Sequence, residues 1–233
     1  MSFKGAIFDL DGTLFESMHV WRNIDIEFLS KRGLEVPLDY LDKIISLNFD
    51  EAALFTIERF GFNETKEEII KEWFDMAIYA YGHDVGLKPH ALEYLEYLKY
   101  KNIPMAVATS SDEALYLATF ENLKLTSYFN KIVTSGEIGC GKNKPDIYIE
   151  AANRLSLKPS ECVVFEDIYH GMKSAQSAGF FTVIMEDESS VRQREQLKAE
   201  ADIYITDYSK LLNQDILFSD FEDLPSCAIK GKQ

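Results

Sequence analysis

Two aspartates separated by one residue, Asp9 and Asp11, follow directly on the short apolar run from Gly5 to Phe8. Such a run predicts a buried strand of an α/β sheet, and ligands of these sheets bind beyond the carboxyl ends of the strands. Residues two apart in a strand point to the same side, and Gly12 lets the chain turn sharply after them. One carboxylate there can attack while its neighbour moves a proton. The stretch therefore predicts an active site.

A second polar strand end is expected at Thr109 and Ser110, after the apolar segment 103–109. Hydroxyl groups beside the free N–H groups of a helix start suit a phosphoryl oxygen, because the helix dipole also favours an anion. The alternative is that these residues only cap the helix that begins near Asp112. For this motif taken alone, capping is the better interpretation.

A third candidate is Lys142, which lies in a glycine-rich loop shortly before Pro145. Proline suits the first turn of a helix, so the lysine precedes a helix start and can project towards a site above the sheet. The alternative is an ordinary solvated lysine. Lys144 is a second candidate, but its place beside Pro145 favours the surface.

The last strand end carries two adjacent acids, Glu166 and Asp167, after the apolar run from Cys162 to Phe165. Adjacent buried acids are costly unless they pair or bind a cation. Together with Asp9 they predict an oxygen-rich site of the kind that Mg²⁺ prefers. The alternative is a helix N-terminus enriched in acids, which has equal weight for this pair alone.

The elements that must position these residues form a parallel α/β pattern. Strands are predicted by apolar runs at 4–9, 103–109, 131–134, 161–166, 180–185 and 202–206, and amphipathic segments predict helices between most of them. This is the pattern of a Rossmann-like α/β fold with a parallel sheet.

The segment 16–83 interrupts that pattern with helical signals, including capping-box spacing at Thr65 and Glu68 and glycines at 33, 61 and 82 where helices are expected to stop. It predicts a bundle of about four helices inserted as a cap. The predicted domains are a core of residues 1–15 and 84–215, a cap of 16–83 and a C-terminal tail of 216–233.

Composition limits the partners. The formal charge of −15 argues against nucleic acid and against an anionic membrane, since both need clustered basic residues. Three scattered cysteines, Cys140, Cys162 and Cys227, fit neither a disulfide framework nor a zinc site, so we expect them to be reduced. No apolar stretch has the length of a membrane helix and no signal peptide precedes the first strand, which predicts a cytoplasmic protein.

Four motifs in order, namely Asp9-Leu10-Asp11-Gly12-Thr13, Thr109, Lys142 before Pro145, and Glu166-Asp167 followed by Gly171, resemble those of the haloacid dehalogenase superfamily. The resemblance covers almost the whole chain. The inserted segment 16–83 is similar to the helical cap of the branch that holds phosphatases and β-phosphoglucomutase-like enzymes.

The resemblance implies roles for these residues. Asp9 would be the nucleophile that forms an aspartyl-phosphate, and Asp11 the general acid and base. Thr109 and Lys142 would hold the phosphoryl oxygens, with Ser110 beside them in the substrate-binding group. Asp11 implies oxygen–phosphorus chemistry, because branches that cleave other bonds lack an acid at that position.

The resemblance also implies a metal site. Mg²⁺ would be bound by Asp9, the backbone carbonyl of Asp11 and Asp167, with Glu166 as a direct or water-mediated partner. The implied activity is hydrolysis of a small phosphate monoester. The sequence predicts neither the identity of that substrate nor the oligomeric state.

Two alternatives remain at this point. A β-phosphoglucomutase-like enzyme needs a group that grips a second phosphate, yet the loop 46–50 holds no lysine or arginine, and Trp21 stands where relatives commonly have histidine. A catalytically silent phosphate-binding module has the same fold, because fold alone does not prove function. Intact Asp9, Asp11 and Lys142 argue against the silent module.

Overall fold

The computed structural model describes residues 3–44, 47–212 and 217–218. The chain divides into two compact units, one made of Met1–Met18 with Gly86–Gln233 and the other of His19–Val85. Most of the predicted tail 216–233, Cys227 among it, and Ser46 of the predicted loop 46–50 lie outside the described residues. None of the helices in the described residues has the length and apolar character needed to cross a membrane.

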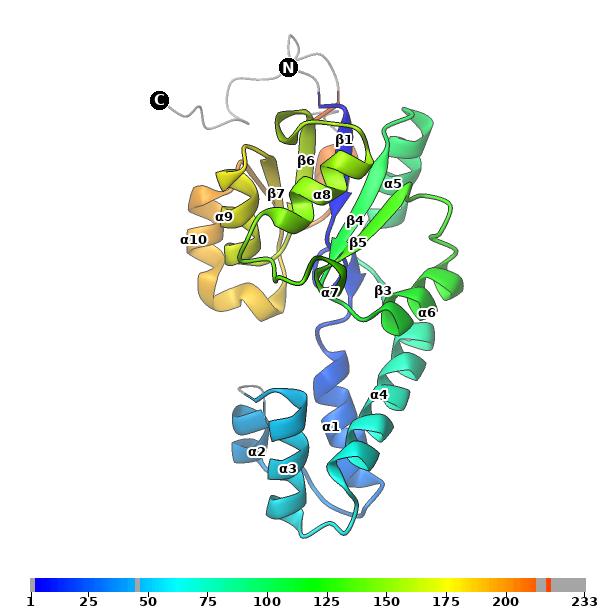
Figure 1. Cartoon of the computed structure of the whole chain (residues 1–233), viewed down its shortest axis with the longest axis vertical. Coiled ribbons are helices and arrows are strands. Elements are labelled where there is room, and N and C mark those ends of the chain that lie inside the picture. Colours follow the sequence, from blue (N-terminus) through cyan, green and yellow to red (C-terminus); the bar gives the residue numbers. More distant parts are fainter. Residues whose placement is uncertain (1–2, 45–46, 213–216, 219–233) are drawn as a thin grey trace. The chain divides into compact units, whose positions relative to one another are not determined.

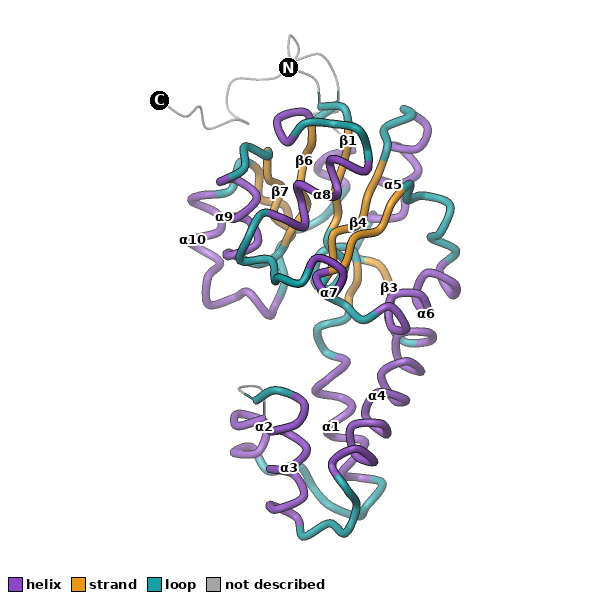
Figure 2. Tube along the Cα trace, in the orientation of Figure 1, coloured by secondary structure: helices purple, strands orange, loops and turns teal. Residues whose placement is uncertain are grey.

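A parallel sheet of six strands, counted within the described residues, forms the centre of the first unit in the order β5-β4-β1-β6-β7-β8 (Figures 1 and 2). The strands are β1 (Gly5–Phe8), β4 (Met105–Thr109), β5 (Lys131–Thr134), β6 (Cys162–Glu166), β7 (Phe181–Met185) and β8 (Ile203–Ile205). Each overlaps one of the segments predicted from the apolar runs. The prediction of an α/β fold with a parallel sheet is confirmed.

The helices of this unit follow the doubly wound pattern. Helix α8 (Asp146–Arg154) contacts β1, β4 and β5, and α9 (Tyr169–Ser177) contacts β6 and β7, on the near face of the sheet in Figure 1. Helix α5 (Ala91–Tyr100) and the short α11 (Ser209–Leu212) contact each other on the far face. The remaining segments are α6 (Glu113–Leu123), α7 (Ser135–Ile138), α10 (Arg194–Glu200) and the 3₁₀ turns Pro159–Glu161 and Glu188–Gln193.

Strand β1 lies at the topological switch point of the sheet. The chain proceeds from β1 to β4 and β5 on one side, then returns to β6, β7 and β8 on the other. Loops after β1, β4 and β6 therefore leave the sheet next to one another at its carboxyl edge. In open α/β sheets this crevice is where ligands bind.

The sheet is held by apolar residues that are buried on both faces. Ile7, Ala106 and Val164 lie in neighbouring strands and, with Tyr148 and Ala151 of α8, belong to one buried cluster. Near-continuous apolar strands are required wherever helices cover both faces of a parallel sheet. This rigid centre sets the positions of the strand ends.

The second unit contains helices α1 (Val20–Ser30), α2 (Leu38–Ile44), α3 (Phe49–Phe60) and α4 (Lys66–His83). The predicted capping box is present at the start of α4, where the Thr65 side chain accepts from the Glu68 N–H and the Glu68 carboxylate accepts from the Thr65 N–H. Gly61 ends α3 in the left-handed conformation. The expected stop at Gly82 is wrong, because α4 continues to His83.

Two short strands, β2 (Phe15–Glu16) and β3 (Gly86–Leu87), pair antiparallel where the chain leaves and re-enters the first unit. Neither was predicted, because two residues are too few to produce a periodic pattern. Phe15 pairs with Leu87 and Glu16 with Gly86. The segment that begins at the Asp9–Asp11 motif therefore ends in a strand that is paired with the returning chain.

Candidate active site

Asp9 is the first residue after β1, and its side chain is almost completely buried. Its N–H donates to the carbonyl of Phe165 on β6 at 3.0 Å, so the backbone here is still held as part of the sheet. The next residues turn tightly, since the N–H groups of Thr13, Leu14 and Phe15 all donate to the Leu10 carbonyl. The sheet therefore fixes the position of Asp9.

Asp11 lies on that turn and is only partly buried. The hydroxyl of Ser17, just after β2, donates to Asp11 Oδ1 at 2.6 Å. Gly12, between the acid and Thr13, has a positive φ of 80°, and a Cβ there would lie 2.5 Å from Asp167 Oδ2. Glycine at position 12 thus allows the Asp9 loop to lie directly against the loop after β6.

Lys142 connects two of the acids. Its ammonium group forms ion pairs with Asp9 Oδ1 and, at 2.6 Å, with Glu166 Oε1, while only 6% of the residue is exposed. Burial opposes the charge on this lysine, but the carboxylates of Asp9 and Glu166 outweigh that effect and raise its pKa. The interpretation of Lys142 as a solvated loop lysine is therefore wrong, whereas Lys144 is exposed.

Glu166 is held from several sides. Its Oε1 also accepts from the hydroxyl of Tyr148 at 2.7 Å, and its Oε2 lies 3.3 Å from the Asp167 N–H. A Cβ on Gly171 would lie 2.8 Å from the Glu166 Cδ and 2.9 Å from the Tyr148 hydroxyl. Glycine at position 171 therefore makes room for the glutamate and its hydrogen bonds.

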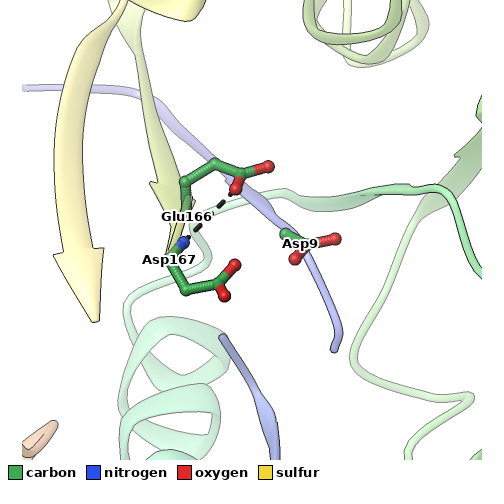
Figure 3. A group of neighbouring side chains, drawn as sticks. All are labelled: Asp9, Glu166 and Asp167. Carbon is green, nitrogen blue, oxygen red and sulfur yellow. Dashed lines mark hydrogen bonds between the residues drawn. The ribbon is translucent and has the colours of Figure 1, made fainter. Parts of the chain in front are cut away.

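The carboxylates of Asp9, Glu166 and Asp167 form one buried cluster, with one oxygen of each within 4.8 Å of the others (Figure 3). Burial raises the pKa of Asp9 to about 7, although the ammonium of Lys142 lowers it. Burial and then the charges of Glu166 and Asp9 raise the pKa of Asp167 well above its usual range. Three buried acids thus face a single buried ammonium group.

The donor set fits a magnesium ion. The hydroxyl of Thr13 lies 3.2 Å from Asp9 Oδ2 and 3.3 Å from Asp167 Oδ1, and it can donate its single proton to one of them at a time. Lys142 pairs with Asp9 and Glu166, so this cluster of three buried carboxylates holds more negative charge than that ammonium balances, which is costly. Hard oxygen ligands with excess negative charge are what Mg²⁺ requires. Both oxygens of Glu166 are engaged, Oε1 by Lys142 and Tyr148 and Oε2 by the Asp167 N–H. Asp9 pairs with Lys142 through Oδ1 only, so its Oδ2 and the carboxylate of Asp167 are the better-placed ligands.

Thr109 and Ser110 follow β4, the strand next to β1. Thr109 is fully buried, and its hydroxyl accepts from the Ser111 N–H at 3.0 Å. Ser110 is exposed, and its hydroxyl pairs with that of Ser135 at 2.7 Å. The cap of helix α6 is Asp112, whose side chain accepts from the Ala114 N–H, so the capping role suggested for Thr109 and Ser110 belongs to Asp112.

Several residues at this site were not predicted. The contacts of Thr13 with Asp167 and of Tyr148 with Glu166 join segments that are distant in the chain, whereas Ser17 reaches Asp11 through the turn after β1. The hydroxyl of Tyr148 gives no sequence signal, because the residue reads as one apolar position of an amphipathic helix. Thr13 carried a weak signal, since it lies inside the first motif.

Comparison with known proteins agrees with this geometry. A model for "Haloacid dehalogenase-like hydrolase" matches residues 6–185, a range that runs from β1 to β7 and includes every residue of the site. The probable pseudouridine-5'-phosphatase of Drosophila melanogaster is 29% identical over 188 residues, which cover 78% of this chain and 81% of that protein. The fructose-1-phosphate phosphatase of Escherichia coli is 27% identical over 189 residues, covering 78% and 95%.

Among solved structures, the β-phosphoglucomutase of Clostridium difficile superimposes with a TM-score of 0.64 at 19% identity, covering 90% of this chain and 93% of that one. At this identity the likeness concerns the fold. The family match spans most of the chain, and its range contains the four strand ends that carry the acids, the hydroxyl and the lysine. The chain belongs to the haloacid dehalogenase-like hydrolase family.

Proposed function

We propose that the protein is a Mg²⁺-dependent phosphatase that hydrolyses a small phosphorylated metabolite through a covalent phosphoryl intermediate on Asp9. The observation that carries the proposal is the buried ion pair of Asp9 with Lys142, placed beside Asp167 at the switch point of the sheet. The names of the relatives, which are phosphatases of a nucleotide and a sugar phosphate, support the same reaction class.

In the first step an Asp9 oxygen attacks phosphorus, and the ester bond from phosphorus to the leaving oxygen breaks. The carboxylate is suited to this role because the sheet holds its backbone and Lys142 holds one of its oxygens. Asp11 donates a proton to the leaving oxygen, so that the product departs as an alcohol. The hydrogen bond from Ser17 orients Asp11 for this transfer.

In the second step water attacks the phosphorus of the aspartyl-phosphate, and the bond from phosphorus to the Asp9 oxygen breaks, so that Asp9 leaves as a carboxylate. Asp11, now ionised, takes the proton of that water, which regenerates both acids and releases inorganic phosphate. Splitting one displacement into two lets the same carboxyl group act first as acid and then as base. The partial exposure of Asp11 is consistent with exchange of protons with solvent.

The phosphoryl group carries negative charge that must be balanced within a site that is already acidic. Lys142 supplies one positive charge beside Asp9, and its pairing with Glu166 keeps the ammonium in place. Thr109 at the end of β4, with Ser110 after it, offers hydroxyl and N–H donors to the phosphoryl oxygens. We assign these residues to substrate binding.

Mg²⁺, held by Asp9, Asp167 and the backbone carbonyl of Asp11, would neutralise charge on the phosphoryl group and on the attacking carboxylate. Asp167 belongs to this set because its side chain lies against Gly12 of the Asp9 loop. Glu166 acts on the metal site indirectly, because its carboxylate pairs with Lys142 and accepts from the Asp167 N–H. The need for a cation follows from three buried acids facing one ammonium group.

We further propose that residues 16–83 act as a cap that selects the substrate. Of the predicted loop 46–50, the described residues 47–50 include no basic residue; Phe49, the first residue of α3, packs edge-on against Trp21 with ring centroids 5.2 Å apart. An aromatic pair does not supply the charge that a second phosphate needs. This favours a phosphatase over a sugar phosphomutase.

The proposal is tested by phosphate release from a panel of sugar phosphates and nucleoside monophosphates, with Mg²⁺ and with EDTA. We expect turnover that EDTA abolishes and added Mg²⁺ restores. Asp9→Asn should be inactive, while Asp75→Asn, which breaks an exposed ion pair with Lys71 on α4, should retain wild-type activity. Turnover in EDTA, or full activity of Asp9→Asn, would contradict the proposal.

Assays of the same purified protein distinguish the two alternatives, a sugar phosphomutase and a catalytically silent binding module. A mutase converts β-glucose 1-phosphate to glucose 6-phosphate in the presence of a bisphosphate primer, and we expect no such product. A silent binding module binds phosphate mimics without releasing phosphate from any ester. Either result would replace the phosphatase assignment.

A further inference from the structure

A second buried lysine, Lys88, lies just after β3, outside the cluster of Asp9 and Lys142. Only 6% of the residue is exposed, and its ammonium group lies 2.9 Å from Glu16 Oε2 and 2.7 Å from Asp187 Oδ2. Its own N–H donates to the carbonyl of Leu14 at 2.8 Å. All of these residues belong to the same compact unit. The phosphatase steps described above give this lysine no role.

One of its partners leads to the general acid. Glu16 forms β2 with Phe15 and is followed directly by Ser17, whose hydroxyl donates to Asp11 at 2.6 Å. β2 is only two residues long and has a single partner strand, so the backbone pairing alone holds it weakly. The ion pair of Glu16 with Lys88 adds a side-chain restraint next to Ser17.

The other partner, Asp187, lies in a segment that contacts the loop carrying Asp167. Asp187, at the end of β7, has a side chain that is 1% exposed, and its second oxygen accepts from the Ser189 N–H at 2.8 Å. The next residue, Ser190, donates its hydroxyl to the backbone carbonyl of Asp167 at 2.8 Å. A Cβ on Gly12 would lie 3.4 Å from the Asp187 Cγ, so this loop also lies beside the turn after Asp9.

Lys88 remains charged despite its burial. Burial disfavours the ammonium, but the hydrogen bonds to Asp187 and Glu16 outweigh this and raise its pKa. The hydrogen bonds from Lys88 and Ser189 overcome the burial of Asp187 and lower the pKa of that carboxyl. A buried pair of this kind contributes little net stability compared with apolar residues of similar volume. Stability therefore does not explain why the pair of Lys88 and Asp187 is buried at this place.

We propose that Lys88 is a positioning residue that connects two halves of the active site. Through Glu16 it holds the segment that orients Asp11, and through Asp187 it holds the loop that supports Asp167. The proposal rests on the proposed phosphatase function, since it assigns Asp11 to proton transfer and Asp167 to Mg²⁺. It predicts one measurable defect when the contact with Glu16 (the Glu16 arm) is lost and a different one when the contact with Asp187 (the Asp187 arm) is lost.

The Glu16 arm is tested by how strongly the rate of hydrolysis depends on the leaving group of the ester. An alkyl phosphate needs protonation of its leaving oxygen, whereas 4-nitrophenyl phosphate has a leaving group stable as an anion. In Glu16→Gln we expect kcat/KM, which reports the steps up to departure of the leaving group, to fall about tenfold for the alkyl ester and less than about threefold for the nitrophenyl ester. Since the Glu16 side chain is 51% exposed, this substitution buries no charge.

The Asp187 arm is tested by Mg²⁺ binding to the substrate-free protein, measured by calorimetry. In Lys88→Met we expect the Mg²⁺ dissociation constant to rise about fivefold because Asp167 loses its support. Simple electrostatics predicts the opposite sign, since loss of a positive charge near the site should tighten cation binding. Lys88→Arg, which keeps the charge, should restore most of the affinity.

Because Lys88→Met leaves Asp187 buried without a cation, circular dichroism is used to check that this variant folds. The double variant Lys88→Met/Asp187→Asn removes both charges, so electrostatics predicts unchanged Mg²⁺ binding and loss of positioning predicts weaker binding. Lys4→Met, which breaks a more exposed 2.7 Å pair with Glu161 at the other end of the sheet, is the control for loss of a lysine charge. It should match the wild type in every measurement.

The outcomes separate the two proposals. Equal loss of kcat/KM on both esters in Glu16→Gln, or unchanged or tighter Mg²⁺ binding in folded Lys88→Met or in the double variant, would overturn the role of Lys88 while leaving the phosphatase intact. A wild-type protein that releases phosphate from neither ester would overturn the proposed function itself. Leaving-group-dependent loss with weakened Mg²⁺ binding is the result that we expect.

Discussion

Two buried lysines, Lys142 and Lys88, each contact two carboxylates, yet their surroundings differ. Lys142 faces Asp9 and Glu166, with Asp167 close by, so acids outnumber the cation in a space without solvent. Lys88 faces Asp187, which is buried, and Glu16, whose side chain is half exposed and can keep part of its hydration. The first cluster has an excess of negative charge, and the second is nearly balanced.

The effect of this difference is visible in the acids. Burial raises the pKa of Asp9 to about 7, whereas Lys88 and Ser189 overcome burial and lower the pKa of Asp187. A group that is short of compensation is ready to bind a cation or react, and a group that is fully compensated serves as a fixed support. This difference is the basis for proposing chemistry at Lys142 and positioning at Lys88.

The largest expected effect comes from replacing the acid in each cluster with its amide. Asp9→Asn removes the nucleophile and should lower kcat by about 10⁴-fold or more. Asp187→Asn removes only a support and should lower kcat by about tenfold. Steady-state phosphate release under saturating Mg²⁺ measures both. Losses of similar size would break the distinction between the clusters.

A second expected effect concerns the two lysines. Lys142→Met removes the charge that faces the phosphoryl group and should lower kcat by about 10²–10³-fold. Lys88→Arg keeps both of its carboxylate contacts and should stay within about threefold of the wild type. Near-normal turnover in Lys142→Met, measured on the same ester, would contradict the role assigned to Lys142.

A third test adds volume beside Glu166. Gly171→Ala places a Cβ 2.8 Å from the Glu166 Cδ, so the glutamate must move and pull Lys142 with it. We expect a stability loss of about 1–3 kcal/mol in urea unfolding and a fall in kcat of about tenfold or more. Gly136→Ala, where the nearest atom to a Cβ is 3.9 Å away, is the matched control. Equal changes in stability and in kcat for the two variants would mean that the position of Glu166 does not matter for either property.

The fourth test uses the opposite pKa shifts. Because the folded pKa of Asp9 is raised to about 7, its neutral form stabilises the metal-free protein at low pH, and this contribution is lost as pH rises through about 7. Mg²⁺ competes with that proton, so its stabilising effect should grow with pH. We expect the rise in Tm on adding Mg²⁺ to be larger at pH 8 than at pH 6. An equal rise at both would argue against Asp9 as a ligand.

The smallest effect is expected at Asp187, with the reverse sign. Its pKa is lowered on folding, so its ionised form stabilises the protein above the unfolded value near 4 and loses this effect as pH falls through the folded pKa. Asp187→Asn should cost about 2 kcal/mol at pH 7 and less below pH ~3. Urea unfolding at both values checks this. A cost that grows with acidity would show that Asp187 is not held ionised by Lys88.

The sheet and the acids of the site were predictable because their signals are local. An apolar run followed by Asp9, or by Glu166 and Asp167, marks both a buried strand and the end at which it reaches a ligand. The order of such runs also indicated the parallel sheet and the inserted helices. Family resemblance then gave each residue an expected role.

The Lys88 arrangement was not predictable in the same way. Lys88 stands in an unremarkable stretch, and its partners Glu16 and Asp187 are far from it in sequence. Their meeting depends on the two-residue pairing of β2 with β3 and on the return of β7 to the same edge of the sheet. Contacts that arise from topology leave no pattern in a single sequence.

The most direct test of the central claim is to find the phosphoryl group on the protein. The enzyme is mixed with Mg²⁺ and a good substrate, quenched in acid during turnover, digested and analysed by mass spectrometry. The account predicts a phosphoryl group on Asp9 in the wild type and none in Asp9→Asn. Turnover with no phosphorylated Asp9, or with the phosphoryl group on another residue, would contradict it.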